Sequence, residues 1–117
     1  MKKKLIDTTL RDGEQAPGIV FSYEQRVRIA EMLSQCGIAE IEAGTPAMKG
    51  NDLEFLSWCK KLPVPVSCWC RAVEADIEAA LKAGVERINI SFPVSDRLLK
   101  VFHKTRGWIE IKMLEFS

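Results

Sequence analysis

Residues 35–42 read QCGIAEIE, and this junction decides the fold. An apolar helical segment ends at Gly37, where a helix-terminating glycine belongs, and a short apolar strand pattern follows. Residues 82–89, KAGVERIN, repeat the same order of helix, glycine and strand around Gly84. The repetition indicates a strand–helix unit that occurs more than once in the chain.

Outward from these junctions, strands and helices alternate along the whole chain. Ser22 and Gln25 form a capping-box pattern at the start of the first helix, Pro63 ends the second, and Ser95 caps the fourth. The expected strands are 4–10, 38–43, 64–71 and 86–92; the expected helices are 22–36, 51–62, 74–83 and one from 95 that continues irregularly to the end. Such alternation predicts an α/β protein with a parallel sheet covered by helices.

Two architectures fit this alternation. A doubly wound sheet of four or five strands would be nearly complete in 117 residues. A (β/α)₈ barrel needs about 250 residues, so this chain would supply about half of one.

Composition excludes several classes of protein. The chain is 47% hydrophobic and 28% charged, with a net charge of +1, which is typical of a soluble globular domain and indicates neither a nucleic-acid nor a membrane partner. No apolar run approaches the roughly 18 residues of a transmembrane helix, and we expect a cytoplasmic protein. The cysteines at 36, 59, 68 and 70 lie in apolar segments, so we expect reduced, buried thiols.

Polar residues follow each expected strand at its carboxyl end, where ligands bind in α/β sheets and barrels. They are Arg11, Asp12, Glu14 and Gln15 after the first strand, Glu42 at the end of the second, Arg71 at the end of the third, and Asn89 and Ser91 in the fourth. Glu42 lies between apolar residues and a glycine, which predicts a partner for its carboxylate. Glu14 and Lys49 are expected to be solvated, and an acid such as Glu74 would explain Arg71.

Two other kinds of site are disfavoured by the sequence. A dinucleotide site needs G-x-G-x-x-G, whereas the first turn offers only Gly13 and Gly18 among acidic residues that would repel a pyrophosphate. Cys68 and Cys70 project to one face of a strand, but zinc sites need a wider cysteine spacing and two further ligands, and His103 is the only histidine. Buried packing is the better interpretation of the cysteine pair.

The stretch DTTLRDGEQAPG (7–18) resembles the strand-one signature of the Claisen-condensing acyltransferases related to 2-isopropylmalate synthase and homocitrate synthase. The resemblance continues in order through EIEAGTPAM (40–48), WCRA (69–72) and SFPVSD (91–96), and covers roughly residues 4 to 100. WCRA and PVSD are more similar to homocitrate synthases of the nitrogen-fixation type than to isopropylmalate synthases.

This resemblance implies a (β/α)₈ barrel that adds the methyl group of acetyl-CoA to a 2-oxo acid and then hydrolyses the thioester. For homocitrate synthase the acceptor is 2-oxoglutarate; an isopropylmalate or citramalate synthase is the alternative. By the same resemblance, Asp12 ligates a divalent cation (Mg, Mn or Zn), Arg11 and Glu42 act in catalysis, and Arg11, Gln15, Arg71 and Ser91 bind substrate. A cation chelated by a 2-oxo acid polarises the ketone, and a fixed guanidinium stabilises the charge that develops.

The sequence also departs from the family pattern. The remaining metal ligands of the family are a His-x-His pair, which this chain does not contain, and residues 47–52 hold an additional residue relative to the family pattern. We therefore expect residues 1–117 to be a single partial domain, the N-terminal half-barrel of about four strand–helix units, and to be inactive in isolation. A second polypeptide or a missing C-terminal part would complete the barrel; a non-catalytic fragment or interaction subunit is the alternative. We expect such a half-barrel to expose its two edge strands and an apolar inner face.

Overall fold

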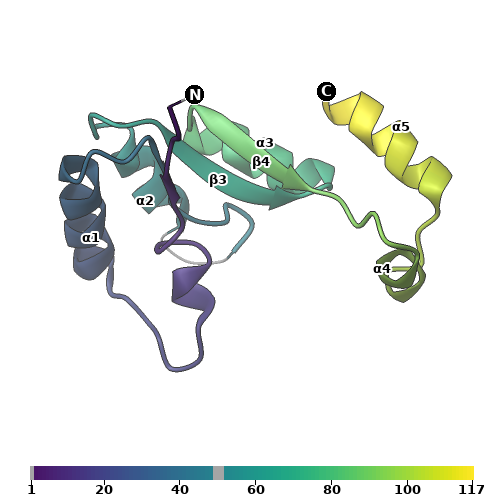
Figure 1. The fold of residues 1–117 in the computed structure, drawn as a ribbon, viewed down its shortest axis with the longest axis horizontal. Coiled ribbons are helices and arrows are strands. Elements are labelled where there is room, and N and C mark those ends of the chain that lie inside the picture. Colours follow the sequence, from purple (N-terminus) through teal and green to yellow (C-terminus); the bar gives the residue numbers. More distant parts are fainter. Residues whose placement is uncertain (1, 49–51) are drawn as a thin grey trace.

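The computed structural model describes residues 2–48 and 52–117. In these residues strands and helices alternate as predicted (Figure 1). The elements are β1 (Ile6–Asp7), the short 3₁₀ helix η1 (Gly13–Gln15), α1 (Tyr23–Gln35), β2 (Glu40–Glu42), α2 (Asp52–Cys59), β3 (Val66–Arg71), α3 (Glu74–Ala83), β4 (Arg87–Ser91), α4 (Asp96–Val101) and α5 (Arg106–Phe116).

The order of the strands distinguishes between the two architectures. Within the described residues the sheet has four strands in the order β1-β2-β3-β4, and every neighbouring pair is parallel. A doubly wound sheet reverses its strand order at a switch point, whereas a barrel adds each strand beside the previous one. The sequential order confirms the predicted fold, the N-terminal part of a (β/α)₈ barrel. β1 and β4 are the two edges of this sheet, as expected.

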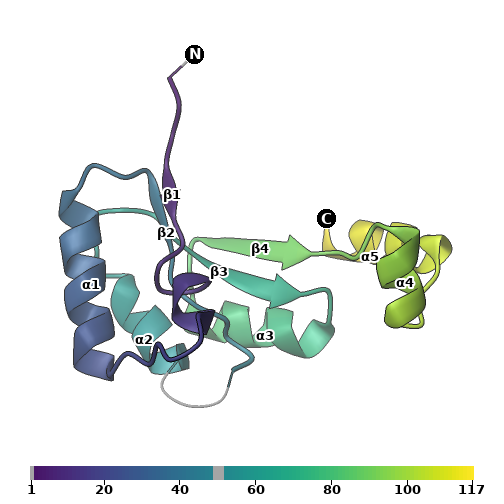
Figure 2. The ribbon, with the colours of Figure 1, turned by 60° about the horizontal axis from the view of Figure 1, so that its bottom comes forward.

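The first three helices lie along one face of the sheet (Figures 1 and 2). α4 and α5 extend beyond the carboxyl ends of β3 and β4 instead. No helix in residues 2–48 and 52–117 has the length and apolar character needed to cross a membrane.

Local signals set the helix ends. Ser22 Oγ accepts a hydrogen bond from the Gln25 N–H at 3.2 Å, and Gln25 Oε1 accepts one from the Ser22 N–H at 2.8 Å, which is the predicted capping box. Gly37 and Gly84 have φ values of +73° and +68°, in the left-handed region that favours glycine at a helix end. The predicted start of the second helix at Asn51 lies outside the described residues.

Two expected elements differ from the structure. The strand predicted at 4–10 is limited to Ile6–Asp7, because the Thr8 carbonyl accepts backbone hydrogen bonds from Arg11, Asp12 and Gly13 and the chain turns there. The last segment forms two helices rather than one irregular helix. Thr105 begins the second of them by accepting a hydrogen bond from the Trp108 N–H at 3.2 Å.

The hydrophobic core lies between the sheet and the helices α1 to α3. Alternate strand residues point into it and pack against helix residues such as Phe55 and Leu56. These strand residues are Ile41, Val66, Cys68, Cys70 and Ile88. Cys59 is also buried there, which confirms buried packing for three of the thiols. The prediction was wrong for Cys36, which is exposed because it lies at the C-cap position of α1.

The opposite side of the sheet is polar, so the expected apolar inner face is wrong. We call it the uncovered face; in β2 to β4 it includes Glu40, Glu42, Ser67, Trp69, Arg87 and Asn89, and in β1 the apolar Ile6 is the register partner of Glu40. The reason is the alternation in β2, β3 and β4, which places apolar residues toward the helices and mostly charged, hydroxyl and amide residues on the other side. Polar partners satisfy this face: Glu40, for example, is buried in an ion pair with Arg87.

Candidate active site

The turn after β1 carries the largest group of predicted site residues. Asp7 Oδ1 accepts a hydrogen bond from the Thr9 N–H at 2.9 Å, and the Thr8 carbonyl accepts the Asp12 N–H at 2.9 Å. These bonds bend the chain into η1 directly after the strand. Arg11 and Asp12 consequently lie at the carboxyl end of β1, beside the end of β2.

A buried carboxylate connects three strands at this end of the sheet. Glu42, which is 5% exposed, accepts the Nε–H of Arg11 at Oε1 (2.5 Å) and the Nδ2–H of Asn89 at Oε2 (2.6 Å). Asn89 Nδ2 also lies 3.3 Å from the hydroxyl oxygen of Ser67. The prediction that Glu42 has a partner is therefore confirmed, and both carboxylate oxygens are used.

Arg11 is held from two sides. Its guanidinium carbon lies 5.5 Å from the centre of the Trp69 ring, and its Nη1 lies 3.4 Å from Asp12 Oδ1. Because Glu42 takes the Nε–H and Asp12 takes Nη1, Nη2 is the group that remains for a further acceptor among the described residues. A guanidinium fixed in this way can meet an oxyanion without reorganising.

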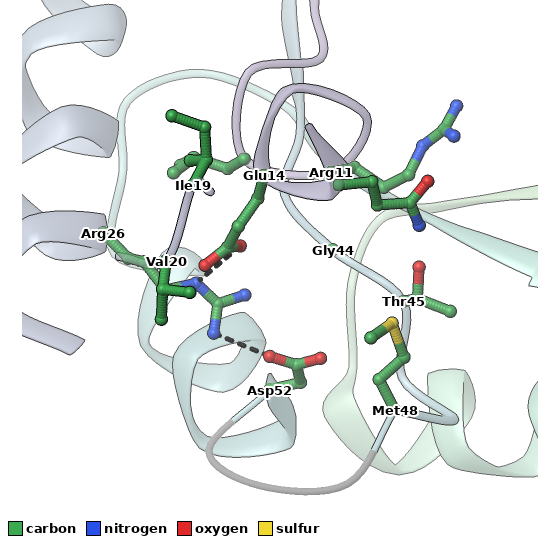
Figure 3. A pocket seen from close by; sticks show the side chains of 11 residues that line it. Arg11, Glu14, Ile19, Val20, Arg26, Gly44, Thr45, Met48 and Asp52 are labelled. Carbon is green, nitrogen blue, oxygen red and sulfur yellow. Dashed lines mark hydrogen bonds and ion pairs between the residues drawn. The ribbon is translucent and has the colours of Figure 1, made fainter. Parts of the chain in front are cut away.

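A cavity of about 240 Å³ lies beside this turn, between the segments that follow β1 and β2 (Figure 3). The side chains that contribute its polar lining are Arg11, Glu14, Gln15, Arg26, Thr45 and Asp52. Gln15 therefore shares a cavity with Arg11, as expected for two residues of one site.

Glu14 does not behave as the sequence predicted. Its Oε2 lies 3.4 Å from Nε of Arg26, which reaches back from α1 toward the turn (Figure 3). The expectation of a solvated Glu14 was wrong because a buried arginine from the next helix pairs with it. Lys49, the other charge expected to be solvated, lies outside the described residues.

Arg71 and Ser91 lie next to each other in a second location. They are register partners at the ends of β3 and β4, and both line a hollow of about 420 Å³. Its other walls are Lys104 and apolar side chains from the strand ends and from α4 and α5, including Trp69, Phe92 and Trp108. Trp69 is common to both places, since it also contacts Arg11.

The partner of Arg71 is Asp76 rather than Glu74. Arg71 Nε and Nη2 each donate to a different oxygen of Asp76 at 2.9 Å, and the Arg71 N–H donates to Oδ2 at 3.1 Å. These hydrogen bonds hold the pKa of Asp76 below its ordinary value, although burial opposes the shift. The Arg71 side chain is still 66% exposed toward solvent.

The described residues alone do not complete a metal site. Within residues 2–48 and 52–117, no three His, Cys, Asp or Glu side chains come together in a group that could hold a metal ion. The Asp12 carboxylate is 69% exposed and therefore accessible to a cation. Divalent magnesium and calcium take six or more oxygen ligands, so Asp12 fits as one ligand of a site that needs others.

The sequence pattern predicted no site role for four residues that contribute to the candidate site: Trp69, Asn89, Arg26 and Asp52. Asn89 alternates with Ser91 in a strand where amide side chains are uncommon, and this signal could have identified it. Arg26 and Asp52 had no local signal, because their pairing joins α1 to α2 across 26 residues.

Comparison with known proteins agrees with this architecture. The HMGL-like family profile matches residues 2–115. The chain is 40% identical over 114 residues to "2-isopropylmalate synthase 2" of Caldanaerobacter subterraneus subsp. tengcongensis, covering 95% of this chain and 30% of that protein. It is 41% identical over 108 residues to "Homocitrate synthase subunit alpha" of Clostridium pasteurianum, covering 90% and 40%.

A third relative is "Homocitrate synthase 1" of a Nostoc species, 45% identical over 98 residues, covering 81% of this chain and 26% of that protein. The chain thus spans between about a quarter and two fifths of the length of these relatives. The profile match over nearly the whole chain shows that the protein belongs to the HMGL-like family.

Proposed function

We propose that this chain supplies the N-terminal part of the active site of an acyltransferase that condenses acetyl-CoA with a 2-oxo acid. The observation that carries the proposal is the hydrogen-bonded group that Glu42, at the carboxyl end of β2, forms with Arg11 in the turn after β1 and Asn89 within β4. The names of the relatives, homocitrate synthase and 2-isopropylmalate synthase, support the reaction class.

In this proposal Arg11 binds the oxygen of the acceptor on which negative charge develops. Glu42 fixes the Arg11 guanidinium by accepting the Arg11 Nε–H, so that the Nη side of the guanidinium faces the acceptor. Gln15 contributes an amide to the same cavity, and Arg71 and Ser91 bind substrate at the ends of β3 and β4. The apolar walls of the second hollow would keep water from the reacting groups.

Members of the HMGL-like family generally depend on a divalent cation. Asp12 would be the ligand that this chain contributes, because its carboxylate is exposed beside Arg11. When bound, such an ion polarises the ketone of the acceptor as a Lewis acid. Arg11 would hold the acceptor beside Asp12, the residue that would ligate the ion.

We further propose that residues 1–117 are one partial domain and that additional polypeptide completes the barrel. β4 is an edge of the sheet, with one side unpaired among the described strands. The helices after it expose large apolar side chains, among them Leu98, Val101, Phe102, Ile111 and Leu114. Exposed apolar surface of this extent is typical of a region that another segment covers.

The proposed acceptor is 2-oxoglutarate, which makes the enzyme a homocitrate synthase, and the WCRA and PVSD segments favour the nitrogen-fixation type. The WCRA and SFPVSD segments, together with homocitrate synthase relatives at 41% and 45% identity, support this choice. The isopropylmalate alternative is supported by a relative of that name at 40% identity over 95% of this chain.

The test is an acetyl-CoA condensation assay that follows free CoA by chromatography. The chain is assayed alone, and then with the polypeptide that completes the barrel, in the presence of a divalent metal. 2-Oxoglutarate, 3-methyl-2-oxobutanoate and pyruvate are offered separately as acceptors. Turnover with 2-oxoglutarate supports the homocitrate synthase proposal, preference for another acceptor replaces it, and no CoA release with any acceptor contradicts the enzymatic function.

A further inference from the structure

Arg26 occupies an unusual position for an arginine, since it is only 6% exposed and lies on a helix. Its guanidinium lies between two carboxylates, Glu14 from η1 and Asp52 from the first turn of α2 (Figure 3). Nη1 donates to Asp52 Oδ1 at 2.6 Å, and Nε lies 3.4 Å from Glu14 Oε2. The guanidinium carbon also lies 4.4 Å from the centre of the Phe55 ring on α2.

The same guanidinium contacts the segment that follows β2. A Cβ atom added to Gly44 would lie 3.4 Å from Arg26 Nη2, so the glycine permits the arginine to approach the backbone. Gly44 is two residues after Glu42, and its carbonyl accepts the Trp69 N–H at 3.0 Å. Arg26 therefore touches both of the segments that carry the Arg11–Glu42 pair.

This arrangement is costly if it serves packing alone. Nε of Arg26 is the one side-chain nitrogen or oxygen, among those buried in the described part of the chain, that lacks a hydrogen-bond partner; its 3.4 Å contact with Glu14 is an ion pair without a hydrogen bond. A buried donor without a partner is unfavourable, and an apolar residue could fill the same space beside Phe55. What an apolar residue could not do is hold Glu14 and Asp52 together, because their carboxylates would then repel each other.

We infer that Arg26 is a positioning residue, which fixes the 11–15 turn against α2 and the segment after β2 by pairing with Glu14. Glu14 lies within three residues of Arg11, Asp12 and Gln15. The orientations of these three side chains therefore depend on the Arg26–Glu14 pair. The inference rests on the proposed function only in its consequence for catalysis. The anchoring itself is a property of this chain.

Hydrogen–deuterium exchange tests the anchoring directly. The amides of Arg11, Asp12, Gly13, Gln15 and Ala16 are hydrogen-bonded within the turn, so their exchange reports its stability. Arg26→Met removes the charge, Arg26→Lys keeps it, and Glu14→Gln removes the partner. Arg28→Met is the matched control, because Arg28 is an exposed residue of the same helix.

We expect Arg26→Met and Glu14→Gln each to accelerate exchange at residues 11–16 by about tenfold or more, while β3 and α3 keep their protection. Arg26→Lys should restore part of the protection, and Arg28→Met should change nothing. Unchanged exchange at 11–16 in Arg26→Met would overturn the inference. So would a uniform rise across β3 and α3, which would mean that Arg26 only stabilises the whole fold.

In the assembled enzyme, Arg26→Met should raise the KM for the 2-oxo acid or lower kcat while the KM for acetyl-CoA stays unchanged. Arg26→Lys should recover part of the loss. If the unsubstituted assembly does not turn over, the proposed function fails and the exchange experiment still decides the inference.

Discussion

Oε1 of Glu42 lies 2.5 Å from Nε of Arg11, and its other oxygen lies 2.6 Å from the amide nitrogen of Asn89. One carboxylate thus joins residues 31 positions before it and 47 positions after it in the chain. The pairing fixes the angle of the Arg11 guanidinium, and because Nη1 pairs with Asp12, Nη2 is left to donate to a further acceptor. Its consequence for catalysis can be tested with a single atom change.

Glu42→Gln should lower kcat/KM of the assembled enzyme by about 100-fold, comparable to the loss of an oxyanion donor. The amide keeps the shape of the side chain but lacks the charge that holds Arg11. Steady-state kinetics measure the effect, with Glu24→Gln on the exposed side of α1 as the matched control. Full activity in Glu42→Gln would show that the pair is not part of the machinery.

Asp12→Asn should raise the metal concentration required for half-maximal activity by about tenfold or more, because an amide oxygen is a weaker ligand than a carboxylate. Activity titrations with Mn²⁺ and Mg²⁺ measure this shift. Glu54→Gln, at an exposed position on α2, controls for the loss of one negative charge. An unchanged titration curve would refute the assignment of Asp12 as a ligand.

The Arg71–Asp76 pair should make the free energy of unfolding depend on pH in the acidic range. The pKa of Asp76 is lowered in the folded state, so the ionised carboxylate favours folding. This contribution is fully present above the ordinary aspartate pKa of about 3.9 and is lost as the pH falls through the lowered value. Asp76→Asn should cost about 1–2 kcal/mol of unfolding free energy at pH 7, a modest figure because Arg71 is largely exposed.

Urea unfolding of the two proteins from pH 7 down to about pH 2 measures that difference. It should shrink steadily below about pH 4. A difference that is constant with pH would mean that Asp76 contributes by packing and not by its charge.

Thiol reactivity should separate Cys36 from the other cysteines. Cys36 is exposed, whereas burial raises the pKa of Cys59 to about 12 and also raises the pKa values of Cys68 and Cys70. The thiolate is the reactive form, so a disulfide reagent at pH 8 should label one thiol rapidly in the folded chain and all four after denaturation. Cys36→Ser should abolish the rapid phase; two rapid thiols in the folded chain would contradict the packing of β3.

The parts of the fold that the sequence predicted correctly depend on neighbours in the chain. Ser22 with Gln25, and Gly37 and Gly84 at helix ends, are local signals, and α3 begins and ends as expected. The length of β1 was overestimated because the bonds to the Thr8 carbonyl depend on the turn that follows.

The candidate site likewise contains residues that a local pattern identifies and residues that depend on distant contacts. Glu42 was identifiable as a partnered carboxylate from its apolar surroundings. Its partners depend on the register of β2, β3 and β4, which no local pattern specifies. Asp76 was missed in favour of Glu74 because no local pattern specifies which acid in the first turn of α3 faces Arg71. Arg26 was missed because its pairing joins distant segments.

The polar character of the uncovered face has a thermodynamic consequence for any polypeptide that closes over it. Covering the exposed Arg87 and the half-buried Asn89, which pair with the already buried Glu40 and Glu42, would remove charged and amide groups rather than hydrocarbon from water. The heat capacity change of such an association would be small for its area, since only apolar burial makes it strongly negative. Calorimetry over a range of temperatures would therefore distinguish a partner that docks on this face from one that covers the apolar side chains of α4 and α5.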